Sequence, residues 1–304
     1  MLPLRFAVQG SGQMAATMRG LIGDAGEGAA EAVYIAGRNR DHAARSIAAL
    51  EAGKAVLCEK PFAMTAGEAE EIVALSRQKR LLYMEAVPTP FLPAVAAALE
   101  AARAGRLGTL RKLEASFGYP ISRRSRPRLF EADGGVLADR AVYPLMLALI
   151  ALGPVERSEA AVERDGQGVD VAARFVLRHA GGAHSDLAIS FGTLLDNSLW
   201  IEGDAGAVEV PPPLLSAQRL SVLPPRRSAP SRSWRRLRQN PVVRRLCDIA
   251  SRTSGAHLPH AGAIHAHVVE HFSALFRAGA LESPVVSHER MLAVARLIEG
   301  ARRG

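Results

Sequence analysis

The clearest candidate for chemistry is a lysine at the end of a short apolar stretch. Residues Ala55 to Cys58 have the composition of a buried strand, and Glu59, Lys60 and Pro61 follow them directly. In open sheets of parallel strands, ligands bind beyond the carboxyl ends of the strands. A lysine at that place can donate a proton to a substrate oxygen or hold the oxygen as a cation. A solvated Glu59–Lys60 ion pair without chemistry is the alternative.

A second pair of candidates, Asp139 and Tyr143, lies four positions apart within the stretch Asp133 to Pro144. On a helix this spacing places both side chains on one face. Hydride transfer from an alcohol carbon requires loss of the hydroxyl proton, and a tyrosine near a lysine can accept it because the cation favours the phenolate. Asp139 would orient the substrate or Lys60, and a nicotinamide would supply the redox step. An ordinary amphipathic helix with a tyrosine reaching the surface is the alternative.

The N-terminal residues indicate where such a cofactor would bind. A strand from Leu4 to Gln9 is expected before a glycine turn, and a helix after it to about Ile22. The turn has the pattern G-x-G-x-x-A and consists of Gly10, Ser11, Gly12, Gln13, Met14 and Ala15. The first glycine allows the tight bend, the second lets a pyrophosphate approach, and the alanine permits close packing of helix on strand. The phosphates would bind at the helix N-terminus, where free N–H groups favour anions.

The composition is that of a globular protein long enough for two domains, with 304 residues, 48% hydrophobic and 22% charged. The two cysteines, Cys58 and Cys247, are too few for a disulfide framework and fit a reducing compartment. No apolar run approaches the ~20 residues of a membrane span. The chain enters a strand at Leu4 without a basic leader, so we expect a cytoplasmic protein without a signal peptide.

The net charge of +8 comes from one segment. Residues Arg226 to Arg252 contain nine arginines and one acid, Asp248, while the rest of the chain has 29 basic and 29 acidic residues. Trp234 is the only aromatic residue there, so the segment offers no stacking series for bases. We therefore predict a solvated or partner-facing insert over residues 224–256 rather than a nucleic-acid site, with a loop followed by a short basic helix from Pro241.

Several of these stretches resemble one family. Ala49 to Pro61 is similar to the Glu-Lys-Pro segment of the glucose–fructose oxidoreductase/inositol dehydrogenase/MocA (GFO/IDH/MocA) family, and Asp133 to Pro144 resembles its Gly-Gly-Gly-x-Leu-x-Asp-x-Gly-x-Tyr/His motif. Further similarities, including one to the dihydrodiol and xylose dehydrogenase branch, lie at Glu85-Ala86, Gly105 to Gly108 and Leu281 to Val286. The resemblance implies catalytic roles for Lys60, Asp139 and Tyr143, a place beside the cofactor for Glu59 and Lys60, and a substrate contact for Glu85.

The resemblance also indicates a missing segment. Gly23 to Ala30 is a short link, and the strand Ala32 to Ala36 follows it. In the family, a Thr-Pro-Asn-x-x-His loop comes after the fourth strand, and Asn39 and His42 match that loop. We therefore expect the second strand, its helix and the third strand to be absent, about 30 residues. Alternatively, Ala32 to Ala36 is the second strand and Arg38 would meet the 2′-phosphate of NADP.

Two departures from the family pattern affect the substrate site. Arg140 replaces a small apolar residue, where it would bind a substrate carboxylate or block the site, and Ala141 replaces a glycine. Pro88 and Pro90 replace an aromatic residue and an arginine. These changes favour a second hypothesis, in which the chain is a catalytically impaired relative that serves as a binding or assembly module.

The main hypothesis is a hydride-transferring oxidoreductase that acts on a sugar or cyclic diol with NADP or NAD, NADP being slightly preferred. We expect a truncated Rossmann-type domain over residues 1–88, which binds the cofactor, and an α+β domain over residues 89–304 with an open, mostly antiparallel sheet. The exposed face of that sheet is the expected surface for a homodimer.

One motif points elsewhere. His267 to His271 has the pattern H-x-x-E-H, in which two histidines on a helix can bind zinc. Only 33 residues follow His271 to supply a third ligand, and five histidines between His257 and His271 make a chance match common. We therefore expect no metal.

Overall fold

The computed structural model describes residues 4–224, 255–260 and 262–304, together with the single residues 233, 237, 239, 240, 242, 243 and 246. Most of the arginine-rich insert, including most of the predicted helix from Pro241, therefore lies outside the described residues. The chain divides into two compact units, Met1–Val87 with His265–Gly300 and Pro88–Ile264 with Ala301–Gly304.

Unit 1 is built on a parallel sheet whose four strands follow each other in chain order. The strands are β1 (Phe6–Gln9), β2 (Ala32–Ile35), β3 (Ala55–Glu59) and β4 (Tyr83–Ala86). The helices between them are α1 (Gln13–Ile22), α2 (His42–Glu51) and α3 (Ala66–Lys79), with a 3₁₀ turn, η1 (Asn39–Asp41), before α2. Strands β2, β3 and β4 are buried along their whole length, as expected for a parallel sheet covered on both faces.

The position of β2 decides between the two hypotheses for the strand after the short link, Gly23 to Ala30. Tyr34 pairs with Val8 on one side and with Leu57 on the other, so β2 lies between β1 and β3. This is the pairing predicted for a chain that lacks the second and third strands of the dinucleotide-binding fold. The alternative, in which β2 lies on the far side of β1, is therefore wrong, and β1 is an edge strand within the described part of the sheet.

The link covers this edge. Asp24 Oδ1 accepts a hydrogen bond from Val8 N, and Phe6 O accepts one from Ala25 N. The guanidinium of Arg19 donates to Val8 O at 2.8 Å and to Gly10 O at 2.9 Å, and its Nε lies 2.9 Å from Asp24 Oδ2. An edge strand exposes unpaired N–H and C=O groups. Here side chains of α1 and the link satisfy the groups that a neighbouring strand would otherwise pair with.

Local signals explain how the helices of unit 1 begin. A capping box begins α3: Thr65 Oγ1 accepts a hydrogen bond from Glu68 N, and Glu68 Oε2 accepts one from Thr65 N. The N-cap of α1 is Gly12, which has no side chain to cap the helix. The first N–H groups of α1 are therefore not taken by a side-chain cap.

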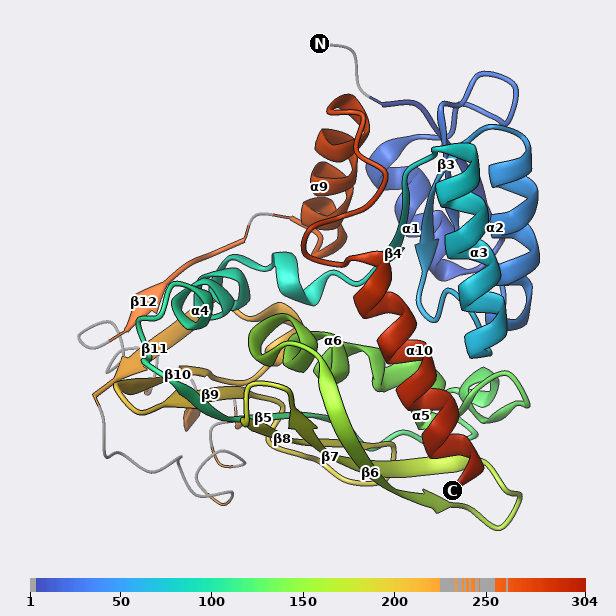
Figure 1. The fold of residues 1–304 in the computed structure, drawn as a ribbon. Helices are drawn as coiled ribbons and strands as arrows, with labels where there is room; N and C mark the ends of the chain where they lie inside the picture. The colour runs from blue at the N-terminus through green and yellow to red at the C-terminus, as the bar shows by residue number, and fades with distance from the viewer. Residues whose placement is uncertain are drawn as a thin grey trace. The chain divides into compact units, whose positions relative to one another are not determined.

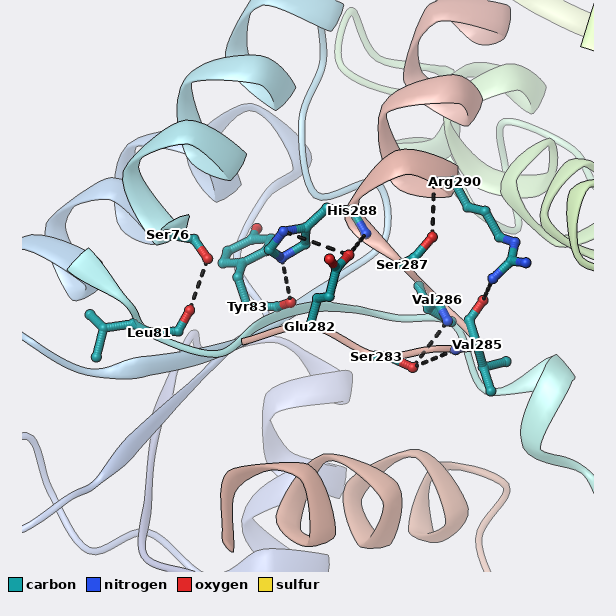
Figure 2. Close-up of polar contacts among 10 residues, drawn as sticks. All are labelled: Ser76, Leu81, Tyr83, Glu282, Ser283, Val285, Val286, Ser287, His288 and Arg290. Atoms are coloured by element: carbon teal, nitrogen blue, oxygen red, sulfur yellow. Dashed lines mark hydrogen bonds and ion pairs between the residues drawn. The ribbon is translucent and has the colours of Figure 1, made fainter. Parts of the chain in front are cut away.

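The C-terminal part of the chain completes unit 1 with α9 (His265–Arg277) and most of α10 (His288–Arg303). Phe272 of α9 packs on Phe6 of β1 with ring centroids 5.8 Å apart. Figure 2 shows the segment before α10 against β4: His288 Nε2 donates to Tyr83 O at 3.1 Å, and His288 N donates to Glu282 Oε2 at 2.6 Å. Ser283 Oγ accepts from Val285 N and Val286 N. A buried polar turn thus ties the chain's end to the strand that carries Glu85.

Unit 2 contains an eight-stranded sheet in the order β12-β11-β10-β9-β5-β8-β7-β6. All neighbouring pairs are antiparallel except β5 with β8. The strands are β5 (Leu110–Gly118), β6 (Val155–Arg164), β7 (Asp170–His179), β8 (His184–Ser190), β9 (Leu199–Gly203), β10 (Gly206–Val210), β11 (Arg219–Leu223) and β12 (Ala256–His257). The predicted open, mostly antiparallel sheet is confirmed.

Helices of unit 2 lie over one face of this sheet (Figure 1). They are α4 (Pro93–Arg103), α5 (Gly135–Arg140) and α6 (Val142–Leu152). The unit also contains the 3₁₀ turns η2 (Thr89–Phe91) before α4, η3 (Pro127–Phe130) before α5 and η4 (Leu214–Ser216) after β10. Phe175 and Leu177 are buried, whereas Arg174, Val176 and Arg178, which alternate with them along β7, are exposed. The second face of the sheet is therefore open along this strand.

Candidate active site

In unit 1, polar groups collect at the carboxyl end of β3. Glu59, the last residue of that strand, is only 7% exposed, and the hydroxyl of the buried Tyr34 donates a hydrogen bond to its Oε1. Tyr34 is on the neighbouring strand β2, so the sheet itself supplies the donor. A buried carboxyl group needs such a partner because burial removes its water. Glu59 is thus fixed immediately before Lys60.

The backbone after Lys60 is held from two sides. His42 Nδ1, at the start of α2, donates to Pro61 O at 2.8 Å. Phe62 N donates to Glu85 Oε1 at 3.1 Å, and Glu85 is on β4. His42 is 1% exposed and Glu85 2% exposed. The sequence-predicted residues His42, Glu59, Lys60 and Glu85 therefore form one cluster around a single turn.

Burial also sets the charges around this turn. It lowers the pKa of His42 and raises the pKa of Glu85 to about 8, although Lys60 opposes the shift of Glu85. Burial lowers the pKa of His265 as well, and this histidine interacts electrostatically with Glu59 and Lys60. Sequence reasoning missed His265 because it lies among several histidines at the start of α9, and only the fold brings α9 to β3.

The glycine turn at the end of β1 has the geometry that a phosphate cradle needs. Gly10 has φ +139°, and a Cβ placed on it would lie 2.4 Å from Ala36 O. Ala15 is fully buried, and Ser11 and Gln13 are exposed at the turn. Because no side chain caps α1, the turn fits the phosphates of a dinucleotide through backbone N–H groups. Met14 is half-buried beside these residues.

Arg38 and Asn39 follow β2 at the same edge of the sheet, since β1 and β2 are parallel. Arg40 lies 3.8 Å from Asp41 within η1. Glu31, by contrast, pairs with Arg5 at the opposite end of β1. Glu31 therefore does not lie at the cofactor end of the sheet.

In unit 2, Asp139 lies on α5 and Tyr143 on α6. Ala141 joins the two helices with helical backbone angles, φ −65° and ψ −32°. Tyr143 is 9% exposed and packs edge-on against Phe117 with ring centroids 5.5 Å apart. Asp139 lies 3.6 Å from the Nε atom of Arg140. The structure thus brings Asp139, Arg140 and Tyr143 together at one helix junction.

Arg140 is enclosed rather than exposed. Its guanidinium lies 4.9 Å from the ring centre of Phe117 and 4.6 Å from that of Phe191. Its Nη1 donates to Tyr119 O and Ser190 O. Burial lowers the pKa of Arg140, while Asp139 opposes this shift. These contacts support a role in holding Asp139 rather than in meeting a substrate carboxylate.

The structure explains why glycine occupies positions 134 and 135 of this motif, which the sequence did not reveal. Asp170, at the start of β7, accepts from Leu137 N at 2.7 Å and so caps α5. A Cβ on Gly135 would lie 2.4 Å from Asp170 Oδ1, and one on Gly134 would lie 2.6 Å from Leu129 O. Asp170 lies far from the motif in sequence, and no local signal marks it.

Comparison with known families assigns the chain. Residues 5–87 match the model of the oxidoreductase family with an NAD-binding Rossmann fold, and residues 95–209 match the GFO/IDH/MocA C-terminal domain. The chain belongs to the GFO/IDH/MocA oxidoreductase family. Its N-terminal unit is thus of the NAD-binding Rossmann type, with the shortened sheet described above.

The similar curated proteins of this family are dihydrodiol dehydrogenases. Trans-1,2-dihydrobenzene-1,2-diol dehydrogenase of Bos taurus is 34% identical over 63% of this chain and 58% of its own length. The enzyme of the same name from Mus musculus is 29% identical over 90% of this chain and 77% of its own length. The matched region thus spans less than two thirds of the bovine relative.

Solved structures share the fold. An aldose-aldose oxidoreductase from Caulobacter crescentus, complexed with glycerol, has a TM-score of 0.76 at 22% identity over 98% of this chain and 88% of its own. A 3-ketoreductase from Actinomadura kijaniata, in complex with NADP and TDP-benzene, has a TM-score of 0.74 at 22% identity over 100% of this chain and 98% of its own.

Two other properties follow from the described residues of this family member. None of its helices in those ranges has the length and apolar character needed to span a bilayer. No three His, Cys, Asp or Glu side chains there are placed to hold a metal ion. In the H-x-x-E-H segment, His271 Nε2 lies 2.8 Å from Ser283 Oγ, and His267 Nδ1 lies 3.7 Å from Glu270.

Proposed function

We propose that this GFO/IDH/MocA member is a nicotinamide-dependent oxidoreductase that transfers a hydride between its cofactor and a sugar or cyclic diol. Its relatives are named dihydrodiol dehydrogenases, and the solved structures with this fold include sugar oxidoreductases. The observation that carries the proposal is the turn after β3. His42 and Glu85 hold the peptide bond between Pro61 and Phe62, immediately after Lys60, by its C=O and its N–H group. Such fixed backbone is what a proton-transferring lysine requires.

In this proposal, one proton moves with each hydride: Tyr143 exchanges it with the substrate hydroxyl while Lys60 holds the oxygen as a cation, or Lys60 itself is the donor. Asp139 orients the substrate, and Arg140 holds Asp139 through the contact of 3.6 Å. The bound nicotinamide would supply the redox chemistry. The glycine turn, Gly10 to Ala15, would hold the pyrophosphate, and Glu59, Lys60, Arg38, Asn39 and His42 would lie along the rest of the cofactor.

The shortened sheet has a consequence for cofactor affinity. The adenosine half of a dinucleotide normally rests against the strand beside β1. Here Arg19 and Asp24 occupy that edge instead. We therefore expect weak binding, held mainly by the phosphates and the nicotinamide, with little discrimination between NAD and NADP unless Arg38 or Arg40 reaches the ribose.

A catalytically impaired binding module is the second candidate. The short link and the enclosed Arg140 favour it, because they alter the cofactor edge and the substrate motif.

Nicotinamide fluorescence and turnover tests separate the two candidates. NADH and NADPH are added to the purified chain, and Lys60→Ala and Tyr143→Phe are assayed on a panel of sugars and diols. Lys79→Ala is the matched control, because Lys79 forms an exposed ion pair with Glu51 on α2 and α3. A loss of about 10²-fold or more in both site variants, with the control unchanged, supports the enzyme. Absence of cofactor binding at millimolar concentration would refute it.

We also propose a functional division at about residue 88, with cofactor binding in residues 1–88, and substrate binding and dimerisation in residues 89–304. Residues 265–300 of this second part belong to unit 1. The exposed face of β7 supports a homodimer, because its ion pair Arg174–Asp186 and the 41% exposed Val176 offer both polar and apolar contacts. Sedimentation at several concentrations tests the oligomeric state.

A further inference from the structure

The side chain of Glu85 is the least expected feature of the Lys60 turn. Glu85 lies opposite Cys58 in the register of β3 and β4, and it is 2% exposed. One oxygen, Oε1, accepts from Phe62 N, whereas the other, Oε2, is buried without a hydrogen-bond partner. A buried polar atom without a partner is rare and costs free energy, most of all when it carries charge. The environment therefore favours the uncharged acid.

The surroundings of Glu85 contain one cation and several groups that oppose ionisation. Lys60 is the cation that acts on Glu85, and Glu59 raises its pKa by repulsion. Cys58 and Tyr83 are buried beside it on β3 and β4, and each interacts electrostatically with it. From the adjoining helices, His42 of α2 and His265 of α9 are kept neutral by burial at this end of the sheet. Two interactions therefore favour ionised Glu85, the hydrogen bond from Phe62 N to Oε1 and the charge of Lys60, whereas burial and Glu59 oppose ionisation.

We propose that Glu85 is a positioning residue that holds the Lys60 turn as an uncharged acid, and that its ionisation at alkaline pH draws the Lys60 ammonium away from the substrate. The proposal rests on the proposed function for its effect on turnover. In the acid form, Glu85 accepts from Phe62 N and exerts little pull on Lys60. In the ionised form, Oε2 would carry charge without a hydrogen-bond partner, and Lys60 is the cation that acts electrostatically on Glu85 and can compensate this charge.

The first test compares pH–rate profiles of the wild type, Glu85→Gln and the control Glu71→Gln, which changes an exposed glutamate on α3. Because the pKa of Glu85 is raised to about 8, wild-type turnover should fall above that pH. Glu85→Gln keeps the acceptor for Phe62 N and cannot ionise, so its alkaline decline should shift upward by at least about one pH unit. Glu71→Gln should follow the wild type. An unchanged alkaline decline in Glu85→Gln overturns the proposal.

The second test does not require activity. The pKa of Glu85 is raised on folding, so its favourable contribution is complete below the unfolded value of 4.5 and is lost as pH rises to about 8. The folding equilibrium of the wild type relative to Glu85→Gln should weaken over this window, by up to about tenfold per pH unit. A constant difference overturns the proposal.

If Glu85→Gln does not fold, carbon-13 NMR of the glutamate carboxyl groups in the wild type tests the proposal instead. One carboxyl group should titrate near pH 8, and titration of all of them in the acid range refutes the proposal. A wild type that shows this titration but no cofactor binding or turnover would refute the proposed function alone.

Discussion

The two ends of the parallel sheet in unit 1 are built in different ways. At the end of β3 and β4, the groups that hold the Lys60 turn are almost fully enclosed: His42 is 1%, Glu85 2% and Glu59 7% exposed. At the edge of β1, the groups that replace a neighbouring strand are open, with side-chain exposures of 40% for Arg19 and 33% for Asp24. One end is held by buried hydrogen bonds and the other by a surface ion pair.

This difference shows where the chain tolerates change. Buried polar groups are strongly coupled to their partners, since removal of one leaves another without compensation. Exposed ion pairs contribute little and can be exchanged for solvent. A sheet that lacks one βαβ unit can therefore satisfy the polar groups of its edge strand with surface residues. The Lys60 turn, by contrast, needs all of its buried hydrogen-bond partners. Four predictions test this comparison.

The largest loss of stability is expected at Gly10, where the backbone after β1 closely approaches the backbone after β2. Gly10→Ala would place a Cβ 2.4 Å from Ala36 O at a φ of +139°, so β1 and β2 would have to separate at the cradle. We expect a loss of about 3 kcal/mol or more in stability and of nucleotide binding. Urea unfolding and nicotinamide fluorescence measure both. The control Gly20→Ala lies within α1 with nothing within 4 Å, and should stabilise by about 0.5–1 kcal/mol. A harmless Gly10→Ala would contradict the close approach.

The next effect tests the buried end. Tyr34→Phe removes the donor to Glu59 without a change of shape and should cost about 2 kcal/mol, because a buried carboxyl loses its partner. Addition of Glu59→Gln replaces the carboxyl group that accepts this hydrogen bond by a neutral amide, which loses less without the tyrosine hydroxyl, so the double variant should lose less than the sum of the single changes. Urea unfolding of the four proteins gives the coupling. Additive losses would show that the two side chains are not coupled.

Much of this buried end was predictable from the sequence, but its partners were not. Glu59, Lys60 and His42 are marked by local pattern, because a strand followed by a charged pair and a helix start are near in sequence. Tyr34 and His265 carry no local signal; they reach Glu59 and Lys60 only through strand pairing and the return of the chain in α9. The short link and the loop match at Asn39 and His42 predicted the order of the strands, but only the pairing of β2 with β3 excluded a place for β2 on the far side of β1.

Unit 2 was predictable in class and less so in detail. The alternation of Phe175 and Leu177 with exposed residues marks β7 as half-buried, whereas β6 is exposed nearly throughout and shows no such alternation. The enclosure of Arg140 could not be foreseen, because it depends on Phe117 and Phe191 from two other strands or their ends. The sequence alone does not distinguish a charged residue that binds a ligand from one that packs between two aromatic side chains.

The third prediction concerns the segment that ties the chain's end to β4. Burial lowers the pKa of His288, so the folded protein holds it neutral while the unfolded chain binds a proton below about pH 6.5. Stability from this group is complete above that pH and is lost as pH falls, by about 1.4 kcal/mol per pH unit until the folded pKa is reached. Gln does not titrate, so the advantage of the wild type over His288→Gln should shrink between pH 7 and pH 5. A difference that grows on acidification would contradict a neutral imidazole at the buried His288, whose contact with Tyr83 O is drawn in Figure 2.

The smallest effect is expected at the open edge. Asp24→Asn keeps an oxygen for Val8 N and Gly26 N but removes the charge that faces Arg19. Because the pair is exposed, the loss should be below about 1 kcal/mol and should fade in salt. Glu31→Gln is the matched control, since Glu31 pairs with Arg5 at 3.3 Å at the other end of β1 and is also exposed. Urea unfolding at low and high ionic strength measures both variants. A salt-independent loss above about 2 kcal/mol in Asp24→Asn alone would show that this edge depends on Asp24 as closely as the Lys60 turn depends on its buried partners.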